Sequence, residues 1–191
     1  MTRVFIGGPR TLESLDSEVK HRLDTHMDKG HQVLIGDADG ADKAVQAYLE
    51  FKRYREVQVY FGGNEPRNNL GKWVVRQVDS DGAKRSLERE AARDRVMAHE
   101  AEAGFMVWDG KSPEIAMNTW RMIVLRKTTV VYDTRTQSLF NVRAAKDWRQ
   151  MTQGMGITRT QRLQRFLEIE SAYGDRVWEG VQNKGRNVVL N

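Results

Sequence analysis

The stretch Val33–Asp42, VLIGDADGAD, decides the fold. Its first three residues form a short apolar run that is typical of a buried strand. Gly36 ends the run, and the segment from Asp39 to Asp42 favours the start of a helix. Rossmann-like sheets bind ligands where a strand turns through glycine into a helix, because main-chain N–H groups and the helix dipole converge there. An ordinary strand-to-helix turn with an Asp39–Asp42 capping box explains the same residues.

Strand-like apolar runs recur along the chain and alternate with segments of helical periodicity. This alternation predicts a Rossmann-like three-layer α/β/α fold with right-handed crossovers and a mainly parallel sheet of five or more strands. Ser138–Val142 is a candidate extra strand, and Gly62–Gly82 is expected to be a long, partly packed loop. The predicted strands are Arg3–Ile6, Gln32–Ile35, Val57–Phe61, Phe105–Trp108 and Thr128–Tyr132.

The connecting helices start at residues that favour helix N-termini, such as Ser14 and Ser112. His21 and His26 are expected on the exposed surface of the first helix. Trp108, at a strand end, either packs in the core or stacks on a base, and packing is the commoner role of tryptophan. The predicted helices run from Ser14 to Lys29, from Gly40 to Tyr54, from Lys84 to Glu102 and from Ser112 onward.

The chain is expected to divide into a Rossmann-like domain, residues 1–150, and a helical C-terminal extension, residues 151–191. Within the extension, Thr158–Ala172 has the pattern of an amphipathic helix, with Leu163 and Phe166 on its apolar side. We expect this helix to pack on the domain or on a partner subunit. A homodimer or a higher homo-oligomer is also expected.

Composition restricts the classes of function. A chain of 191 residues that is 39% hydrophobic suits one domain with an ordinary core. No apolar run reaches the length of about 18 residues that a membrane span needs, and no signal peptide is recognisable, so we expect a cytoplasmic protein without a membrane partner. The chain has no cysteine. This excludes disulfides and thiolate chemistry, and the spacing of the four histidines argues against a zinc site.

The net charge of +5 is concentrated in the last quarter of the chain. Between Arg143 and Asn191 there are nine basic and five acidic side chains. A basic tail of this kind binds nucleic acid or, more commonly, is a solvated charged surface.

Four short motifs follow one another between Arg3 and Asp133, three of them directly after predicted strands. The motifs are GGPR from Gly7 to Arg10, GDADGAD from Gly36 to Asp42, RDRVM from Arg93 to Met97, and DGKS from Asp109 to Ser112. Together they resemble the SLOG superfamily, and in particular its small stand-alone bacterial members. The superfamily also includes the cytokinin-activating phosphoribohydrolases, the Rossmann domain of DNA-processing protein A and sensor domains for nucleotide-derived messengers. The resemblance implies a nucleotide or nucleotide-derived small molecule bound at the carboxyl ends of the parallel strands.

Two departures from the family pattern bear on activity. The Gly-Thr pair of the family's last loop is Glu114-Ile115 here, and a glutamate of the phosphoribohydrolases corresponds to Asn118. An amide cannot serve as the carboxylate in hydrolysis of an N-glycosidic bond. Binding of a nucleotide-like molecule is therefore the leading expectation. The alternative is a nucleoside or nucleotide N-glycosidic hydrolase with Asp37, Asp42 or Glu114 as the acid–base group, and nucleic-acid binding through the basic tail is the third hypothesis.

The predicted ligand site lies where the loops after the first, second and fourth predicted strands meet. Its carboxylates have three interpretations: they hold ribose hydroxyls, they recruit Mg²⁺ beside a phosphate, or they are helix caps and surface charge. The glycines are expected to leave the main chain open to the ligand, so that Gly40→Val abolishes binding before folding. Glu114 is expected to fill the position of a phosphate. The predicted binding residues are Gly7, Gly8, Arg10, Gly36, Asp37, Gly40, Asp42, Arg95, Asp109, Gly110, Ser112 and Glu114.

Overall fold

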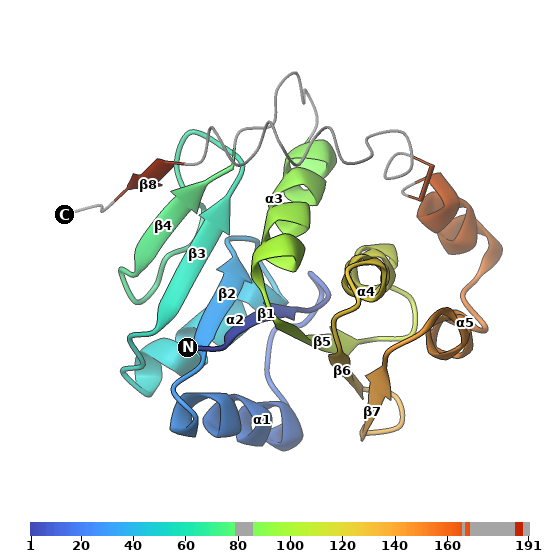
Figure 1. Ribbon diagram of the computed structural model, residues 1–191, viewed down its shortest axis with the longest axis horizontal. Helices are drawn as coiled ribbons and strands as arrows, with labels where there is room; N and C mark the ends of the chain where they lie inside the picture. Colours follow the sequence, from blue (N-terminus) through green and yellow to red (C-terminus); the bar gives the residue numbers. More distant parts are fainter. Residues whose placement is uncertain (79–85, 166, 169–185, 189–191) are drawn as a thin grey trace.

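The computed structural model describes residues 1–78, 86–165, 167–168 and 186–188. These residues form a three-layer α/β fold of the Rossmann type, as the alternation in the sequence predicts (Figure 1). The elements in chain order are β1 (Arg3–Gly7), α1 (Ser17–Asp28), β2 (Gln32–Gly36), α2 (Ala41–Phe51), β3 (Val57–Phe61), β4 (Val74–Gln77), α3 (Ser86–Glu100), β5 (Ala103–Trp108), α4 (Pro113–Val124), β6 (Thr129–Asp133), β7 (Ser138–Val142), α5 (Ala145–Thr152) and β8 (Arg186–Val188).

The order of strands in the sheet places a ligand site next to β1. The order is β7-β6-β5-β1-β2-β3-β4-β8, with β1 to β6 parallel and the two outer strands antiparallel to their neighbours. The chain builds outward from β1 to β4 and then returns to the other side of β1 with β5. In open α/β sheets, ligands bind at the carboxyl ends of the strands where the order reverses. Here that point lies between β1 and β5.

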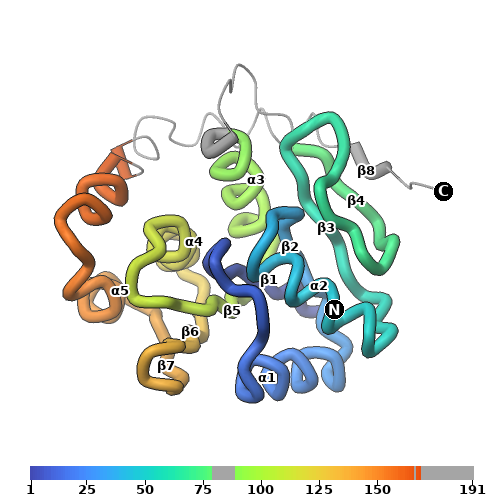
Figure 2. The backbone as a smooth tube through the Cα atoms, turned by 180° about the vertical axis from the view of Figure 1, so that it is seen from behind, coloured from blue at the N-terminus to red at the C-terminus, as the bar shows by residue number. Residues whose placement is uncertain are grey.

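Alternating side chains of the strands form a core on each face of the sheet. In β1, Val4 and Ile6 pack with residues of α1 and α2, whereas Phe5 packs with residues of α3, α4 and α5. Figures 1 and 2 show the two helical layers from opposite sides. Trp108 is fully buried on the face of the sheet that α3, α4 and α5 cover, which confirms the packing interpretation of this residue.

The segment predicted as a long loop contains a strand. β4 extends the sheet beside β3 in parallel register, with Val75 opposite Val59. Val75 is fully buried and Trp73 nearly so. The strand was missed because its apolar run, Trp73–Val75, is only three residues long and follows a segment rich in asparagine and glycine.

Three predictions about helix ends and surfaces were wrong. The N-cap of α1 is Asp16 and not Ser14, and the Asp16 carboxylate accepts a hydrogen bond from the Tyr132 hydroxyl at 2.8 Å. His26 is buried, because it follows Leu23 by three residues and so lies on the inner stripe of α1. The expected capping box at the start of α2 does not form, since Gly40 is the N-cap there.

The C-terminal extension is described up to residue 168, apart from residue 166, and then again at β8. Residues 157–165 form a helix, shown in orange beyond α5 in Figure 1. Its Leu163 is only 4% exposed and joins the core beneath α4 and α5. Phe166, which was predicted on the same stripe, lies outside the described residues. In the described part of the chain, no helix has the length and apolarity that crossing a membrane requires.

Candidate functional site

A cavity of about 310 Å³ lies at the switch in strand order. The loops after β1, β2 and β5 line it, together with α3, α4 and the 157–165 helix. This confirms that the three predicted loops come together. The predicted binding residues that line the cavity are Gly7, Gly8, Arg10, Asp42, Asp109, Ser112 and Glu114.

Five predicted residues lie outside the cavity lining, namely Gly36, Asp37, Gly40, Arg95 and Gly110. Asp37 lies behind the wall, where it is bound by arginines, and the three glycines pack against other parts of the chain. Arg95 of α3 does not line the cavity; Arg93, two residues earlier on the same helix, lines it instead.

The loops after β1 and β2 pack main chain against main chain. Gly40 has a φ of +80°, and a Cβ at this position would lie 2.2 Å from the carbonyl oxygen of Arg10. The next amide, Ala41 N, donates to the carbonyl of Pro9 at 3.1 Å. The expectation that Gly40→Val leaves folding intact is therefore wrong, because only glycine fits here.

Two more glycines accommodate side chains of the protein itself. A Cβ on Gly36 would lie 2.3 Å from Oδ2 of Asp42, and one on Gly110 would lie 2.5 Å from Nε of Arg135. The space beside each glycine is thus occupied by the protein's own atoms. The predicted role of these glycines, to open the main chain to a ligand, is corrected to a role in packing.

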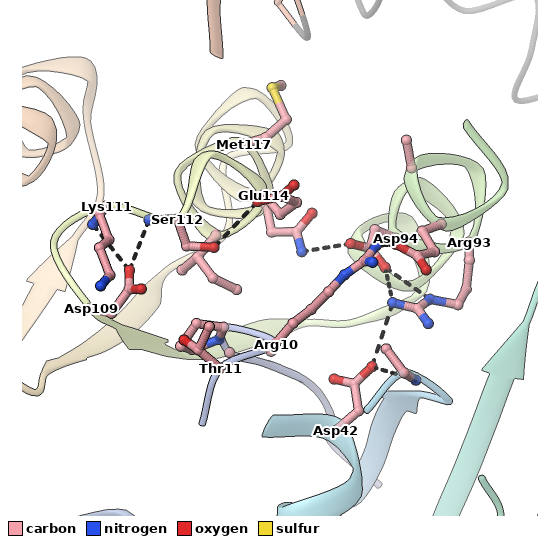
Figure 3. Close-up of a pocket in the computed structure, with 18 of the residues that line it drawn as sticks. Arg10, Thr11, Asp42, Arg93, Asp94, Asp109, Lys111, Ser112, Glu114 and Met117 are labelled. Atoms are coloured by element: carbon pink, nitrogen blue, oxygen red, sulfur yellow. Dashed lines mark hydrogen bonds and ion pairs between the residues drawn. The ribbon is translucent and has the colours of Figure 1, made fainter. Parts of the chain in front are cut away.

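A buried arginine, Arg93, organises the inner wall of the cavity (Figure 3). Its Nη1 donates to Oδ1 of Asp37 at 2.8 Å, and its Nε and Nη2 donate to Oδ1 of Asp94 at 3.0 and 2.8 Å. Nη2 also lies 3.5 Å from Oδ2 of Asp42. Burial by itself lowers the pKa of Arg93, but the three carboxylates raise it above its ordinary value. Arg93 therefore stays charged.

Asp37 and Asp42 share Arg93 but differ in protonation. Burial raises the pKa of Asp42 to about 6, and the charge of Arg93 offsets only part of that effect. Asp37 is also buried, but hydrogen bonds from Arg67 and the charge of Arg93 outweigh burial and lower its pKa. Asp37 is thus held as a carboxylate, whereas Asp42 titrates close to neutral pH.

Asp94 and Asn118 form a second buried pair on the same wall. Asn118 Nδ2 donates to Oδ2 of Asp94 at 2.8 Å, and Arg121 donates to the Asn118 carbonyl oxygen. All three line the cavity and are less than a tenth exposed. The sequence prediction missed Arg93 and Asp94 as site residues. Arg93 precedes the buried Met97 by four residues and so shares its face, but only the structure shows that Met97 is buried.

At the rim, a carboxylate of the protein accepts hydrogen bonds from two main-chain amides that precede α4. Asp109 Oδ1 accepts from Lys111 N at 3.0 Å and from Ser112 N at 2.8 Å. Glu114 accepts from Nη2 of Arg162 at 2.6 Å and from the Ser112 hydroxyl at 3.4 Å. Glu114 lies in the first turn of α4, as predicted, and its carboxylate contacts the 157–165 helix. Its role in place of a phosphate stays a prediction.

Arg10 extends from the loop after β1 across the cavity toward α3 (Figure 3). It forms an ion pair with Glu90, whose other carboxylate oxygen lies 2.9 Å from Nη1 of Arg67. The side chain of Arg10 is half exposed, whereas that of Glu90 is largely buried. Glu90 thus forms ion pairs with Arg10, from the loop after β1, and with Arg67, from the loop after β3.

Within the described residues, no group of three or more histidine, aspartate or glutamate side chains is placed to hold a metal ion. Part of the basic tail, residues 169–185, lies outside these residues. The nucleic-acid and homo-oligomer hypotheses therefore stay predictions.

Comparison of the chain with protein-family models, with curated proteins and with solved structures gave no match in any of the three. The resemblance to the SLOG superfamily consequently stays a prediction from the sequence motifs.

Proposed function

We propose that this protein binds a nucleoside-containing small molecule in the cavity between the ends of β1 and β5. The observation that carries the proposal is the pair of buried carboxylates, Asp42 and Asp94, on the wall of a cavity at the switch point. Acidic side chains near this position of Rossmann-like sheets accept hydrogen bonds from ribose hydroxyls. The motif resemblance described above implies the same class of ligand.

Both carboxylates keep oxygen lone pairs that can accept hydrogen bonds from hydroxyl groups. Asp94 accepts two bonds from Arg93 through Oδ1 and one bond from Asn118 through Oδ2, so Oδ2 keeps a second lone pair. Asp42 accepts from Ala38 N through Oδ2 at 3.2 Å. A hydroxyl that donates to an ionised carboxylate forms a short, charge-assisted bond. Arg93 keeps both carboxylates oriented and so limits the cost of ordering them on binding.

The size and lining of the cavity suit a ligand of about nucleoside size. Its volume of about 310 Å³ is at the lower end of the range for small-molecule sites, about 300–1,000 Å³. Phe5, Ile115 and Met117 supply apolar lining beside the carboxylates. Apolar walls with a few convergent polar groups are the usual composition of ligand pockets.

The test is calorimetric titration with adenosine, guanosine, their 5′-monophosphates and a dinucleotide, combined with native mass spectrometry for a co-purified ligand. We expect at least one compound to bind, and its dideoxy counterpart to bind at least about tenfold more weakly because the hydroxyl bonds are lost. Asp94→Asn should weaken binding to a similar extent. Asp24→Asn is the matched control, because Asp24 also accepts a hydroxyl bond, from Tyr48, but lies outside the cavity. If no compound binds, or if the dideoxy compound binds equally well, the proposal is refuted.

The raised pKa of Asp42 favours one second candidate, hydrolysis of an N-glycosidic bond. A carboxyl group that titrates near neutral pH is suited to general acid–base catalysis. In such a reaction, Asp42 gives its proton to the departing base as the C–N bond breaks. Water adds to the anomeric carbon, and its proton passes to Asp94. Of the three predicted acid–base residues, Asp37 is bound by arginines and Glu114 pairs with Arg162, which leaves Asp42.

Chromatographic detection of free base, released from the same panel of compounds, separates this candidate from binding alone. We expect any release to fall as pH rises above about 6, since Asp42 loses its proton there. Asp42→Asn should abolish release. A compound that binds but yields no free base would exclude hydrolysis of that compound and leave binding as the function.

A further inference from the structure

Two main-chain amides of the β5–α4 loop are already bonded to a carboxylate of the protein. Lys111 N and Ser112 N both donate to the Asp109 carboxylate, at 3.0 and 2.8 Å. A phosphate could replace Asp109 only by leaving that carboxylate without its donors, which costs free energy. An anionic group of a ligand is therefore expected to bind to side chains.

The inner wall of the cavity disfavours an anion as well. Asp42 and Asp94 are buried there, and Arg93 already contacts both of them and also Asp37. A phosphate placed beside these groups would meet like charge in a region of low dielectric constant. The anionic part of a ligand should therefore lie away from this wall, toward the open side of the cavity.

Two cationic side chains line the cavity at its solvent-exposed side, Lys111 from the β5–α4 loop and Arg159 from the 157–165 helix. Both are exposed, and neither forms an ion pair with any part of the chain that the structure describes. Arg162 follows Arg159 by three residues on the same side of the helix and pairs with Glu114 at 2.6 Å. This pair offsets the negative charge at the start of α4 and anchors the helix beside the cavity. Arg10 also lines the cavity but pairs with Glu90, so Lys111 and Arg159 remain as the cations that can bind a ligand.

We infer that Lys111 and Arg159 form an anion subsite for a phosphate group, so that the C-terminal extension completes the site formed by the sheet and its loops. Lysine and arginine both donate charge-assisted hydrogen bonds to phosphate. The inference deepens the proposed function and rests on it for the rest of the ligand. A nucleotide would bind with its ribose hydroxyls at Asp42 and Asp94 and its phosphate between the loop and the helix.

Calorimetric titration with inorganic pyrophosphate at low ionic strength tests the subsite without any nucleoside. The proteins are the full-length wild type, Lys111→Gln, Arg159→Gln and the control Arg165→Gln. Arg165 is an exposed arginine of the same helix that does not line the cavity, so its removal changes the net charge equally. We expect Lys111→Gln and Arg159→Gln each to weaken pyrophosphate binding about five- to tenfold, and Arg165→Gln to leave it nearly unchanged.

A second titration uses adenosine and adenosine 5′-monophosphate. Arg159→Gln should weaken binding of the monophosphate and leave that of adenosine unchanged. The inference is overturned if wild-type protein does not bind pyrophosphate, if Arg159→Gln and Lys111→Gln bind it as tightly as wild type, or if Arg165→Gln weakens it as much. Pyrophosphate binding that depends on Arg159, without binding of any nucleoside, would support the subsite and refute the proposed function. Thermal unfolding confirms that each variant is folded.

Discussion

Replacement of Asp42 by asparagine should stabilise the protein at neutral pH. In the folded state, burial raises the pKa of Asp42 to about 6, compared with an ordinary value of 3.8. The folded state therefore binds the proton more tightly than the unfolded state does. Between these two pKa values, stability falls as pH rises, because the unfolded chain ionises first. Above pH 6, the buried charge of Asp42 costs stability in full.

The magnitude follows from the difference of about two pKa units, which corresponds to about 3 kcal/mol. Asparagine removes this charge and can still accept the hydrogen bond from Ala38 N. Arg93 keeps its contacts with Asp37 and Asp94. We therefore expect Asp42→Asn to raise the free energy of unfolding by about 3 kcal/mol at about pH 7.5 and by about 1 kcal/mol at about pH 4.5.

Urea unfolding of wild type and variant at several pH values measures this difference. Asp37→Asn is the matched control, because Asp37 also contacts Arg93 but has a lowered pKa. Its carboxylate contributes stability above its ordinary pKa, and this stability is lost as pH falls through the lowered value. Asp37→Asn should thus destabilise the protein at neutral pH, opposite to Asp42→Asn. If Asp42→Asn also destabilises at neutral pH, or if its effect does not change with pH, the reasoning is wrong.

The other predictions concern three further positions. Burial lowers the pKa of His26 from 6.5 to about 4, so the free energy of unfolding should fall by about 3 kcal/mol as pH drops from about 6.5 to 4. Urea unfolding of His26→Gln should show a weaker dependence of stability on pH over this range. Gly40→Ala should destabilise more than Gly30→Ala in thermal unfolding, because both glycines have positive φ but only Gly40 has no room for a Cβ; equal losses would contradict this. Glu114→Gln keeps an oxygen that can accept from Arg162 but removes a negative charge near Lys111 and Arg159. It should tighten pyrophosphate binding by about two- to fivefold in calorimetry, whereas weaker binding would argue against the anion subsite.

The place of the site was predictable from the sequence, because strand order in an alternating α/β chain brings certain loops together. Gly7, Asp42 and Ser112 were found in this way, each in the loop or at the helix start that follows an apolar run. The prediction required only the type and sequence of the elements, which hydrophobic periodicity indicates well.

Strand order could not predict which arginine of α3 lines the cavity. Arg93 and Arg95 lie two residues apart on a charged helix, and they point to different sides of it. Only the buried positions of Val96 and Met97 fix the rotation of the helix, and they place Arg93 on the inner side. The mixture of charged and apolar residues in α3 gave too weak a periodicity to show this beforehand.

The function of the glycines also depended on contacts that sequence patterns do not contain. Gly110 lies in the β5–α4 loop, and the side chain that fills the space beside it, Arg135, follows β6. A glycine that accommodates a distant side chain and a glycine that opens the main chain to a phosphate look the same in a sequence. The same limit applies to β4, whose short run becomes a strand only because β3 provides an edge.

The packing of Gly40 on the Arg10 carbonyl, with Ala41 N bonded to Pro9, has a consequence for the rate of ligand association. Two loops that meet through their main chains form the cavity wall before any ligand arrives. Association should then be a single bimolecular step without slow ordering of the wall, since preorganised sites change little on binding. In the ligand-free protein, the Ala41 amide should already exchange slowly with deuterium, as buried hydrogen-bonded amides do.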